Sequence, residues 1–402
     1  MQRLLPLYVA AFSHGFVLWY AIEKFFMQSI GFTDATIGIM AAAYTIVTLL
    51  TETPSGILAD RWSRRGVLLI ASTLLVLATV LGGLSHDVST YIVAMGLWGI
   101  FYALYSGTYE SVVYDVLLEE QQSADNFEKW FGYVRFVDSG ALTLGALLGG
   151  LVSALANPRM TYFVTIPFSL ISVFALLRFR EPLLHKAEPL SSVRSHVAAT
   201  FGAILTRRSL VPVLLVLLSG GLLLKVILEF NQLWWLTLAV PLGMYGVATA
   251  ANLGSLGLGG LLAAKLRIDK PLVLLGVVTV IVASAASLVF WHNFYAVVAV
   301  QMLLVIFMLA SEIIFARSLH DELPSRLRAG AASAVSTLVS IIFIPFSLVF
   351  GSISSRHDTF SAAWLVLGTA VVMVMALIGS VVHRRMQRVR LRDVVSVETP
   401  LK

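Results

Sequence analysis

The sequence contains no cysteine among its 402 residues, and only 12% of its residues are charged. The absence of cysteine excludes disulfide bonds and thiolate metal sites. The scarcity of charge excludes an ordinary soluble domain, in which about a quarter of the residues are charged. A hydrophobic content of 58% and a mean hydropathy of +0.88 indicate instead a chain whose surface faces lipid.

Motifs of enzymes and cofactor sites are also missing from the sequence. We find no nucleotide-binding loop, no metal-ligand cluster and no catalytic triad, and the single glycine-rich stretch, residues 254–260, lies within an apolar run. We therefore expect neither an enzyme nor a bound cofactor or metal. The net charge of +6 would suggest nucleic acid in a soluble protein. Because cytoplasmic loops of membrane proteins also collect Lys and Arg, we predict no nucleic-acid partner.

Long apolar runs make up most of the chain. A helix needs about 20 apolar residues to cross the hydrocarbon core. Twelve such runs lie near residues 4–30, 36–58, 67–84, 89–118, 130–156, 160–179, 210–238, 244–264, 271–291, 293–317, 329–353 and 359–382. The first run is too long for a cleavable signal peptide. The pattern predicts an all-α membrane protein. Its parts would be a six-helix bundle (1–180), a cytoplasmic central loop (181–208), a second six-helix bundle (209–382) and a cytoplasmic basic tail (383–402).

The distribution of Lys and Arg predicts the orientation. With the N-terminus inside, 23 of the 28 basic residues fall in cytoplasmic segments and only Arg159 and Arg356 fall outside. This asymmetry follows the positive-inside rule. We therefore expect an integral protein of a prokaryotic cytoplasmic membrane, with both termini in the cytoplasm.

The two halves of the chain can be laid over each other. A shift of 202 positions places Glu110 on Glu312 and Gly149 on Gly351. Charged residues that match at one shift are harder to attribute to chance than apolar ones. Repeated halves are the usual construction of secondary transporters, with the binding site at their interface.

A motif follows the second run, where residues 56–65 read GILADRWSRR. It resembles the pattern G-x-L-a-D-r-x-G-r-k of the major facilitator superfamily, with Ser63 in place of the usual Gly. The resemblance implies the superfamily's fold of twelve transmembrane helices in two pseudo-symmetric bundles. It also implies a conformational latch on the cytoplasmic side. The latch residues would be Gly56, Asp60, Arg61, Arg64, Arg65 and the partner carboxylate Asp115. Alternatively, these arginines only fix the topology.

A second motif lies in the fifth run, where residues 145–150 read GALLGG. It resembles the antiporter motif G-P-x-x-G-G of drug exporters, with Ala146 in place of Pro. Ordinary small-residue helix packing is the alternative explanation. Drug antiporters of this superfamily often carry an Arg in the middle of span four, but no Arg lies between Tyr91 and Glu119. A different residue is therefore expected to couple transport to protons.

Ionisable residues within spans are costly, so they mark function by default. Glu110 lies in the inner part of span four, at the same depth as Arg135 and Asp138 in span five. A carboxylate that is partly removed from water can take up a proton. We predict that Glu110 carries the proton, that Arg135 and Asp138 tune it, and that Glu312 is its counterpart in the second half.

By the same family resemblance, spans one, four, seven and ten form the walls of the substrate cavity. Aromatic and acidic side chains there suit an amphipathic or cationic ligand. The predicted cavity residues are Phe16, Tyr20, Glu23, Tyr102, Ser106, Tyr109, Lys225, Glu229, Gln232 and Trp235. Structural roles are the alternative for these residues. Aromatic side chains also form belts at the membrane interface. Lys225 and Glu229 can neutralise each other, and Lys24, next to Glu23, can extend its ammonium group to the outer interface. Phe16, Tyr20 and Glu23 would share one stripe of the first helix.

These features together predict a proton-driven exporter of small amphipathic compounds, that is, a multidrug-type antiporter. The first alternative is a proton-coupled uptake symporter for a polar metabolite. The second is a lipid flippase or a non-transporting sensor on the same fold. The expected partners are a small-molecule substrate, protons and membrane lipids, and we expect a monomer.

Overall fold

The structure is a computed structural model that describes residues 2–121, 127–182, 202, 207, 210–323 and 325–397. Within these ranges the chain is helical and contains no strand. Twelve segments are long and apolar enough to cross a membrane. They correspond in order to the twelve predicted runs, so the all-α fold class with twelve spans is confirmed.

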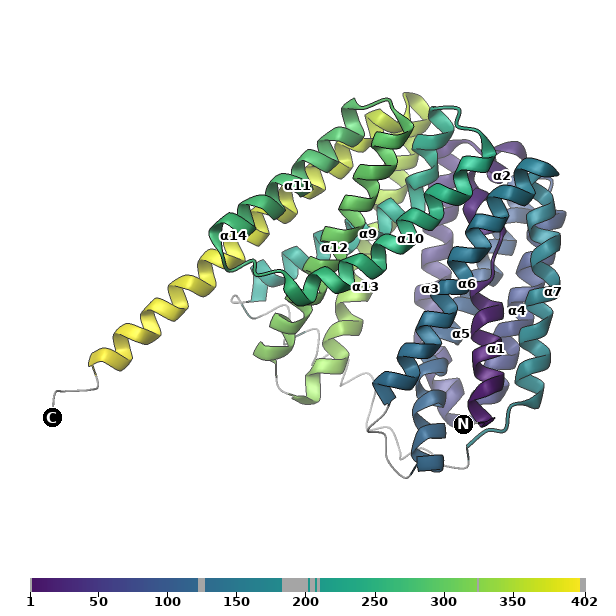
Figure 1. The fold of residues 1–402 in the computed structure, drawn as a ribbon, viewed down its shortest axis with the longest axis horizontal. Coiled ribbons are helices and arrows are strands. Elements are labelled where there is room, and N and C mark those ends of the chain that lie inside the picture. The colour runs from purple at the N-terminus through teal and green to yellow at the C-terminus, as the bar shows by residue number, and fades with distance from the viewer. Residues whose placement is uncertain are drawn as a thin grey trace. The chain divides into compact units, whose positions relative to one another are not determined.

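The helices follow one another along the chain and are connected by short turns in most places (Figure 1). They are η1 (Gln2–Leu4), α1 (Leu5–Gly15), η2 (Trp19–Ile22), α2 (Glu23–Ser29), α3 (Asp34–Arg61), α4 (Arg64–Leu84), α5 (Val88–Gln121), α6 (Phe127–Leu155), α7 (Pro158–Arg178), α9 (Val211–Thr237), α10 (Leu242–Lys265), α11 (Pro271–Phe290), α12 (Phe294–Glu322), α13 (Ser325–Arg356) and α14 (Thr359–Val397).

The first span is broken, although its sequence predicts one continuous helix. The α-helix α1 ends at Gly15, the chain turns irregular, and η2 and α2 complete the span. The predicted single stripe of Phe16, Tyr20 and Glu23 is therefore wrong, because these residues lie in three different local conformations.

The break has a cause in the neighbouring helix α6. A Cβ atom added at Gly149 would overlap the carbonyl oxygen of Leu18, and one added at Gly145 would lie 2.9 Å from the backbone nitrogen of Val17. The backbone of α6 thus packs directly against the irregular segment. The N–H of Leu18 donates a hydrogen bond to Thr165 Oγ1 at 3.1 Å. The hydrogen bond to Thr165 replaces one of the helical hydrogen bonds that the break removes.

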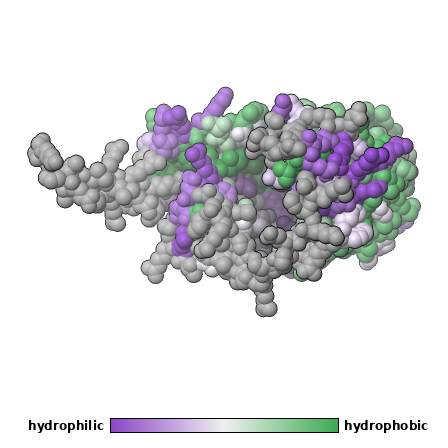
Figure 2. Space-filling model, turned by 90° about the horizontal axis from the view of Figure 1, so that it is seen from below, coloured by the Kyte–Doolittle hydropathy of each residue, from purple (hydrophilic) through white to green (hydrophobic). Residues whose placement is uncertain are grey.

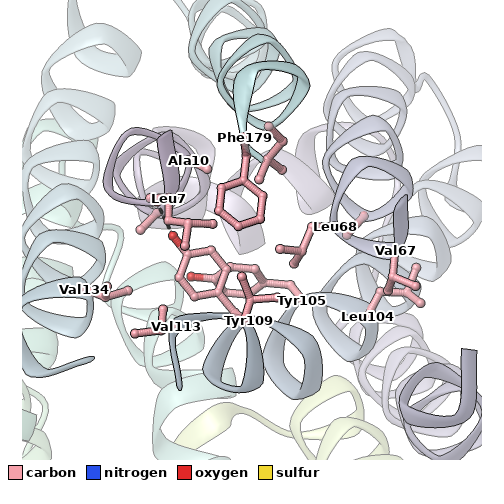
Figure 3. Close-up of a cluster of buried hydrophobic side chains, with 14 of the residues drawn as sticks. Leu7, Ala10, Val67, Leu68, Leu104, Tyr105, Tyr109, Val113, Val134 and Phe179 are labelled. Carbon is pink, nitrogen blue, oxygen red and sulfur yellow. Dashed lines mark hydrogen bonds between the residues drawn. The ribbon is translucent and has the colours of Figure 1, made fainter. Parts of the chain in front are cut away.

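A hydrophobic core holds the first six spans together. It draws buried side chains from η1, α1, α3, α4, α5, α6 and α7 and from the residue that follows α7, Phe179 (Figure 3). Helix α1 packs against α6 and α7, and α4 packs against α5 and α7. Tyr109 of α5 lies inside this core, where its hydroxyl donates a hydrogen bond to the carbonyl of Leu7.

Side chains of opposite polarity occupy different parts of the surface. Figure 2, which looks at the end that carries the N-terminus, shows hydrophilic residues gathered on that end and hydrophobic residues along the flank. Many large apolar side chains on the helices are exposed, among them Leu50, Phe136 and Leu272. Such exposure would be unfavourable in water and is expected for helices that face lipid.

The contacts divide the chain into two compact units. One unit comprises Met1–Leu190, Glu229–Gly254 and Phe343–Thr359, and the other comprises Ser191–Leu228, Ser255–Ile342 and Phe360–Lys402. The first unit therefore contains the first six spans together with parts of α9, α10 and α13. The functional residues described below lie mainly in this first unit.

Candidate functional site

A buried cluster of charges lies where the first span meets α9. Lys24 Nζ is 2.9 Å from Glu23 Oε2 and 2.7 Å from Glu229 Oε1. The Lys24 side chain is only 1% exposed, whereas that of Glu229 is 22% exposed. The alternative that Lys24 snorkels to the interface is wrong, because the two carboxylates hold its ammonium group inside the protein. Removing one partner of such a buried pair typically costs about 3–5 kcal/mol.

The side-chain amide of Gln232 forms hydrogen bonds with the backbone of the irregular part of the first span, beside this cluster. Its Oε1 accepts from the N–H of Lys24 at 3.0 Å, and its Nε2 donates to the carbonyl of Tyr20 at 2.9 Å. Gln232 is itself buried. One side chain of α9 thus satisfies two backbone groups of the first span that have lost their helical partners. Gln232, predicted as a cavity residue, is here a connector between two helices.

Tyrosines surround the two carboxylates of the cluster. Tyr91 donates from its hydroxyl to Glu23 Oε1 at 3.3 Å, and the hydroxyls of Tyr91 and Tyr162 are 2.7 Å apart. On the other side, Tyr20 and Tyr44 lie close enough to Glu229 to interact with it electrostatically.

Tyr102 of α5 completes this second group, since it lies within electrostatic range of both Tyr20 and Tyr44. It is the most open of the three, with 47% of its surface exposed. Glu229 therefore lies within electrostatic range of two tyrosines, from η2 and α3, and a third from α5 lies within range of both of these.

Close helix crossings, made possible by glycine, occur at two further places in the first unit. A Cβ atom at Gly150 of α6 would lie 2.6 Å from the nitrogen of Gly246 in α10. A Cβ atom at Gly351 of α13 would lie 2.6 Å from the carbonyl oxygen of Asp34, and its neighbour Ser354 donates to Asp34 Oδ2 at 2.6 Å. Contact distances this short leave no room for a side chain. These crossings tie spans of the first half to spans of the second half within the first unit.

The residues of the predicted latch form a network at the N-terminal end of α4. Arg64 pairs with Asp115 of α5. The carboxylate of Glu181 accepts from the N–H of Arg64 at 2.6 Å and from Ser63 Oγ at 2.5 Å. Glu181 therefore caps the helix and meets its positive dipole end. Sequence reasoning did not identify Glu181, which lies far from the motif in sequence.

The other latch residues are placed as follows. Arg65 donates to the carbonyls of Leu176 and Leu177 at the C-terminal end of α7. A Cβ atom added at Gly56 would meet no described atom within 4 Å, so the described part of the structure shows no close helix approach at this glycine. The side chains of Asp60 and Arg61 lie outside the described residues.

The residues of the predicted proton site are not bonded to one another. Among the described residues, no hydrogen bond or ion pair joins Glu110, Arg135 and Asp138. The side chain of Glu110 is exposed, the guanidinium carbon of Arg135 lies 5.1 Å from the ring centroid of Phe131, and Asp138 lies beside Gly15 at the end of α1. Glu312, in the second unit, is half-buried.

Several predicted cavity residues lie in packed interiors instead. Phe16 packs against Phe168, with ring centroids 4.4 Å apart, and Trp235 packs edge-on against Tyr245 at 5.4 Å. Tyr109 belongs to the hydrophobic core. These positions follow from the size of the rings, which bury most surface when they fill gaps between helices.

Three further cavity residues are half-buried. Ser106 is half-buried on α5. Lys225 is half-buried on α9 and donates to Ser340 Oγ at 3.3 Å. Glu229 pairs with Lys24 of the first span.

Comparisons by sequence identify a family for this chain. A family model of the Major Facilitator Superfamily matches residues 4–340. Multidrug resistance protein 2 of Bacillus subtilis (strain 168) is 25% identical over 174 residues, which are 42% of this chain and 42% of that protein. Puromycin resistance protein pur8 of Streptomyces alboniger is 25% identical over 146 residues, 36% of this chain and 28% of that protein. The matches thus span less than half the length of either relative.

Comparisons by structure agree on the fold. The nucleoside transporter NupG superposes with a TM-score of 0.75 at 16% identity, covering 94% of this chain and 99% of that one. The D-xylose-proton symporter gives 0.66 at 15% identity, covering 93% and 97%. At such low identity these likenesses show the fold alone. The chain is therefore an integral membrane protein, and it belongs to the Major Facilitator Superfamily.

Proposed function

We propose that this transporter exports small amphipathic compounds in exchange for protons. The observation that carries the proposal is the setting of Glu229. A partly exposed carboxylate within electrostatic range of Tyr20 and Tyr44 combines charge with aromatic faces, and Tyr102 lies within range of both tyrosines. This combination binds amphipathic molecules, above all those with a positive charge, whereas a site for sugars or nucleosides requires hydrogen-bonding groups that match several hydroxyls.

The names of the two sequence relatives support export. One is described as a multidrug resistance protein and the other as a puromycin resistance protein. Resistance to a toxic compound is the expected result of moving it out of the cell. The GALLGG stretch at residues 145–150 is compatible with this direction, because it resembles the antiporter motif.

Glu110 is the proposed proton carrier. It is a carboxylate within a membrane span, it is exposed, and among the described residues it has neither a hydrogen-bond partner nor an ion-pair partner. A carboxylate without a fixed partner can exchange its proton without breaking the packing around it. Arg135 and Asp138 lie on the neighbouring span and would influence the proton through their charges. Glu312 would have a weaker role in the second half.

The proposal is tested by separating coupled from uncoupled transport in proteoliposomes. Glu110→Gln mimics the protonated carboxyl group. The variant should lose proton-driven accumulation of a lipophilic cation but keep counterflow, the exchange of labelled for unlabelled substrate. Glu312→Gln serves as the matched comparison and should lose less. If proton-driven flux and counterflow both survive in Glu110→Gln, this residue is not the coupling site. If both vanish together with binding, Glu110 contacts the substrate instead.

A further inference from the structure

The bonds of Lys24 are divided between two helices of different halves. Its ammonium group contacts Glu23 of its own span at 2.9 Å and Glu229 of α9 at 2.7 Å. Each carboxylate carries one negative charge when ionised, so these three directly bonded groups hold one negative charge more than positive. Lys225, four residues before Glu229 on α9, bonds to Ser340. The contact group around Lys24 is therefore suited to accept one additional cation.

The exposure of these side chains shows where such a cation would enter. The ammonium group of Lys24 is almost fully buried, and Glu23 is nearly as well buried, whereas Glu229 is 22% exposed. The open side of Glu229 is therefore the accessible carboxylate of the group. Tyr20 of η2 and Tyr44 of α3 lie within electrostatic range of Glu229, and Tyr102 of α5 lies within range of both tyrosines. Aromatic faces attract organic cations by several tenths of a kcal/mol to about 2 kcal/mol each.

We propose that Glu229 and these three tyrosines form a binding site for an organic cation, and that Lys24 is the built-in competitor of that cation. This inference rests on the proposed function and names the charge of its substrate. The ligand's positive charge pairs with Glu229 and weakens the bond between Glu229 and Lys24. Lys24 retains Glu23, so it is not left as a buried charge without a partner. Binding then loosens one connection between α2 and α9.

The proposal makes an unusual prediction, because removing a buried positive residue should tighten ligand binding. The probe is tetraphenylphosphonium, whose charge does not depend on pH. Lys24→Met alone would leave two carboxylates close together, and their repulsion would destabilise this variant. The double variant Glu23→Gln with Lys24→Met avoids the problem, since Glu229 then remains as the one carboxylate of the group. We expect this variant to bind the cation about tenfold more tightly than the wild type.

The variant that should lose affinity for the cation is Glu229→Gln, which leaves Lys24 paired with Glu23. It should bind tetraphenylphosphonium about tenfold more weakly. Lys129→Gln is the control, because Lys129 is exposed and lies over the ring of Trp130, away from the cluster. It should bind as the wild type does. Triphenylphosphine oxide, a neutral probe of similar shape, should show no change in any variant.

Binding is measured at equilibrium on purified protein in detergent, without any ion gradient. The proposal is overturned if the double variant binds the cation no more tightly than the wild type, or if Glu229→Gln binds it equally well. It is also overturned if the neutral probe follows the same pattern, because charge would then not be what is recognised. Since no gradient is involved, these outcomes are independent of whether transport is coupled to protons or directed outward.

Discussion

Gly149 is the position where the packing of the first span can be tested most sharply. In Gly149→Ala the new Cβ atom would overlap the carbonyl oxygen of Leu18 and lie 2.8 Å from its carbonyl carbon. Both atoms belong to the backbone, so no side-chain rotation relieves the overlap. Overpacking of this kind costs about 1–3 kcal/mol. Replacing Gly by Ala within a helix otherwise stabilises by about 0.5–1 kcal/mol.

The same helix offers a matched control at Gly140, where an added Cβ atom would meet no described atom within 4 Å. Gly140→Ala should therefore keep or raise the apparent melting temperature of the detergent-solubilised protein, whereas Gly149→Ala should lower it. The free energies of unfolding of the two variants should differ by about 1–3 kcal/mol. Equal melting temperatures for the two variants would refute the reasoning, because they would mean that α6 does not hold the broken segment in place.

Three other predictions concern the latch, the topology and the connector. Asp60→Asn should strongly reduce the transport rate although the protein still folds and inserts. Normal transport kinetics in that variant would contradict the latch hypothesis. A cysteine introduced as Ser191→Cys should resist an impermeant thiol reagent applied outside intact cells, whereas His86→Cys should be labelled, and the reverse result would overturn the orientation. Gln232→Leu removes both hydrogen bonds to the first span and should lower the free energy of unfolding by about 2 kcal/mol or more. The exposed Gln28→Leu should cost much less, and an equal cost would argue against the connector.

The twelve spans could be predicted from the sequence because a membrane helix needs only length and apolar composition. The predicted boundaries mostly agree with the observed helices within a few residues. The pair of Arg64 and Asp115 could also be predicted, because the family motif indicated a partner carboxylate at the inner end of span four. Whether that pair acts as a latch stays a prediction.

The break in the first span could not be predicted from its own residues. It depends on the backbone of α6, which approaches Val17 and Leu18 at glycines some 130 residues further along the chain. Gly15 within an apolar run was the one local signal, and a single glycine is tolerated in many helices.

The contacts of Lys24 were equally hidden in the sequence. Its bond to Glu229 joins residues 205 positions apart. Sequence spacing offered nearer choices, such as Lys225 for Glu229 or the interface for Lys24. The contacts of Tyr44, Tyr91 and Tyr162 also depend on tertiary packing, although a tyrosine in the middle of an apolar span is a weak sign of a polar partner.

The central claim, that transport is an exchange of substrate for protons, is tested most directly by reversing the proton gradient. Proteoliposomes holding the purified protein are given either an acidic or an alkaline lumen, with the membrane potential clamped by potassium and valinomycin. Uptake of labelled tetraphenylphosphonium is then followed against protein-free vesicles. An antiporter should accumulate the cation in vesicles with an acidic lumen, because outflowing protons drive its entry. Accumulation driven by an alkaline lumen would identify a symporter, and uptake that ignores the gradient would exclude proton coupling, so either result would contradict the account.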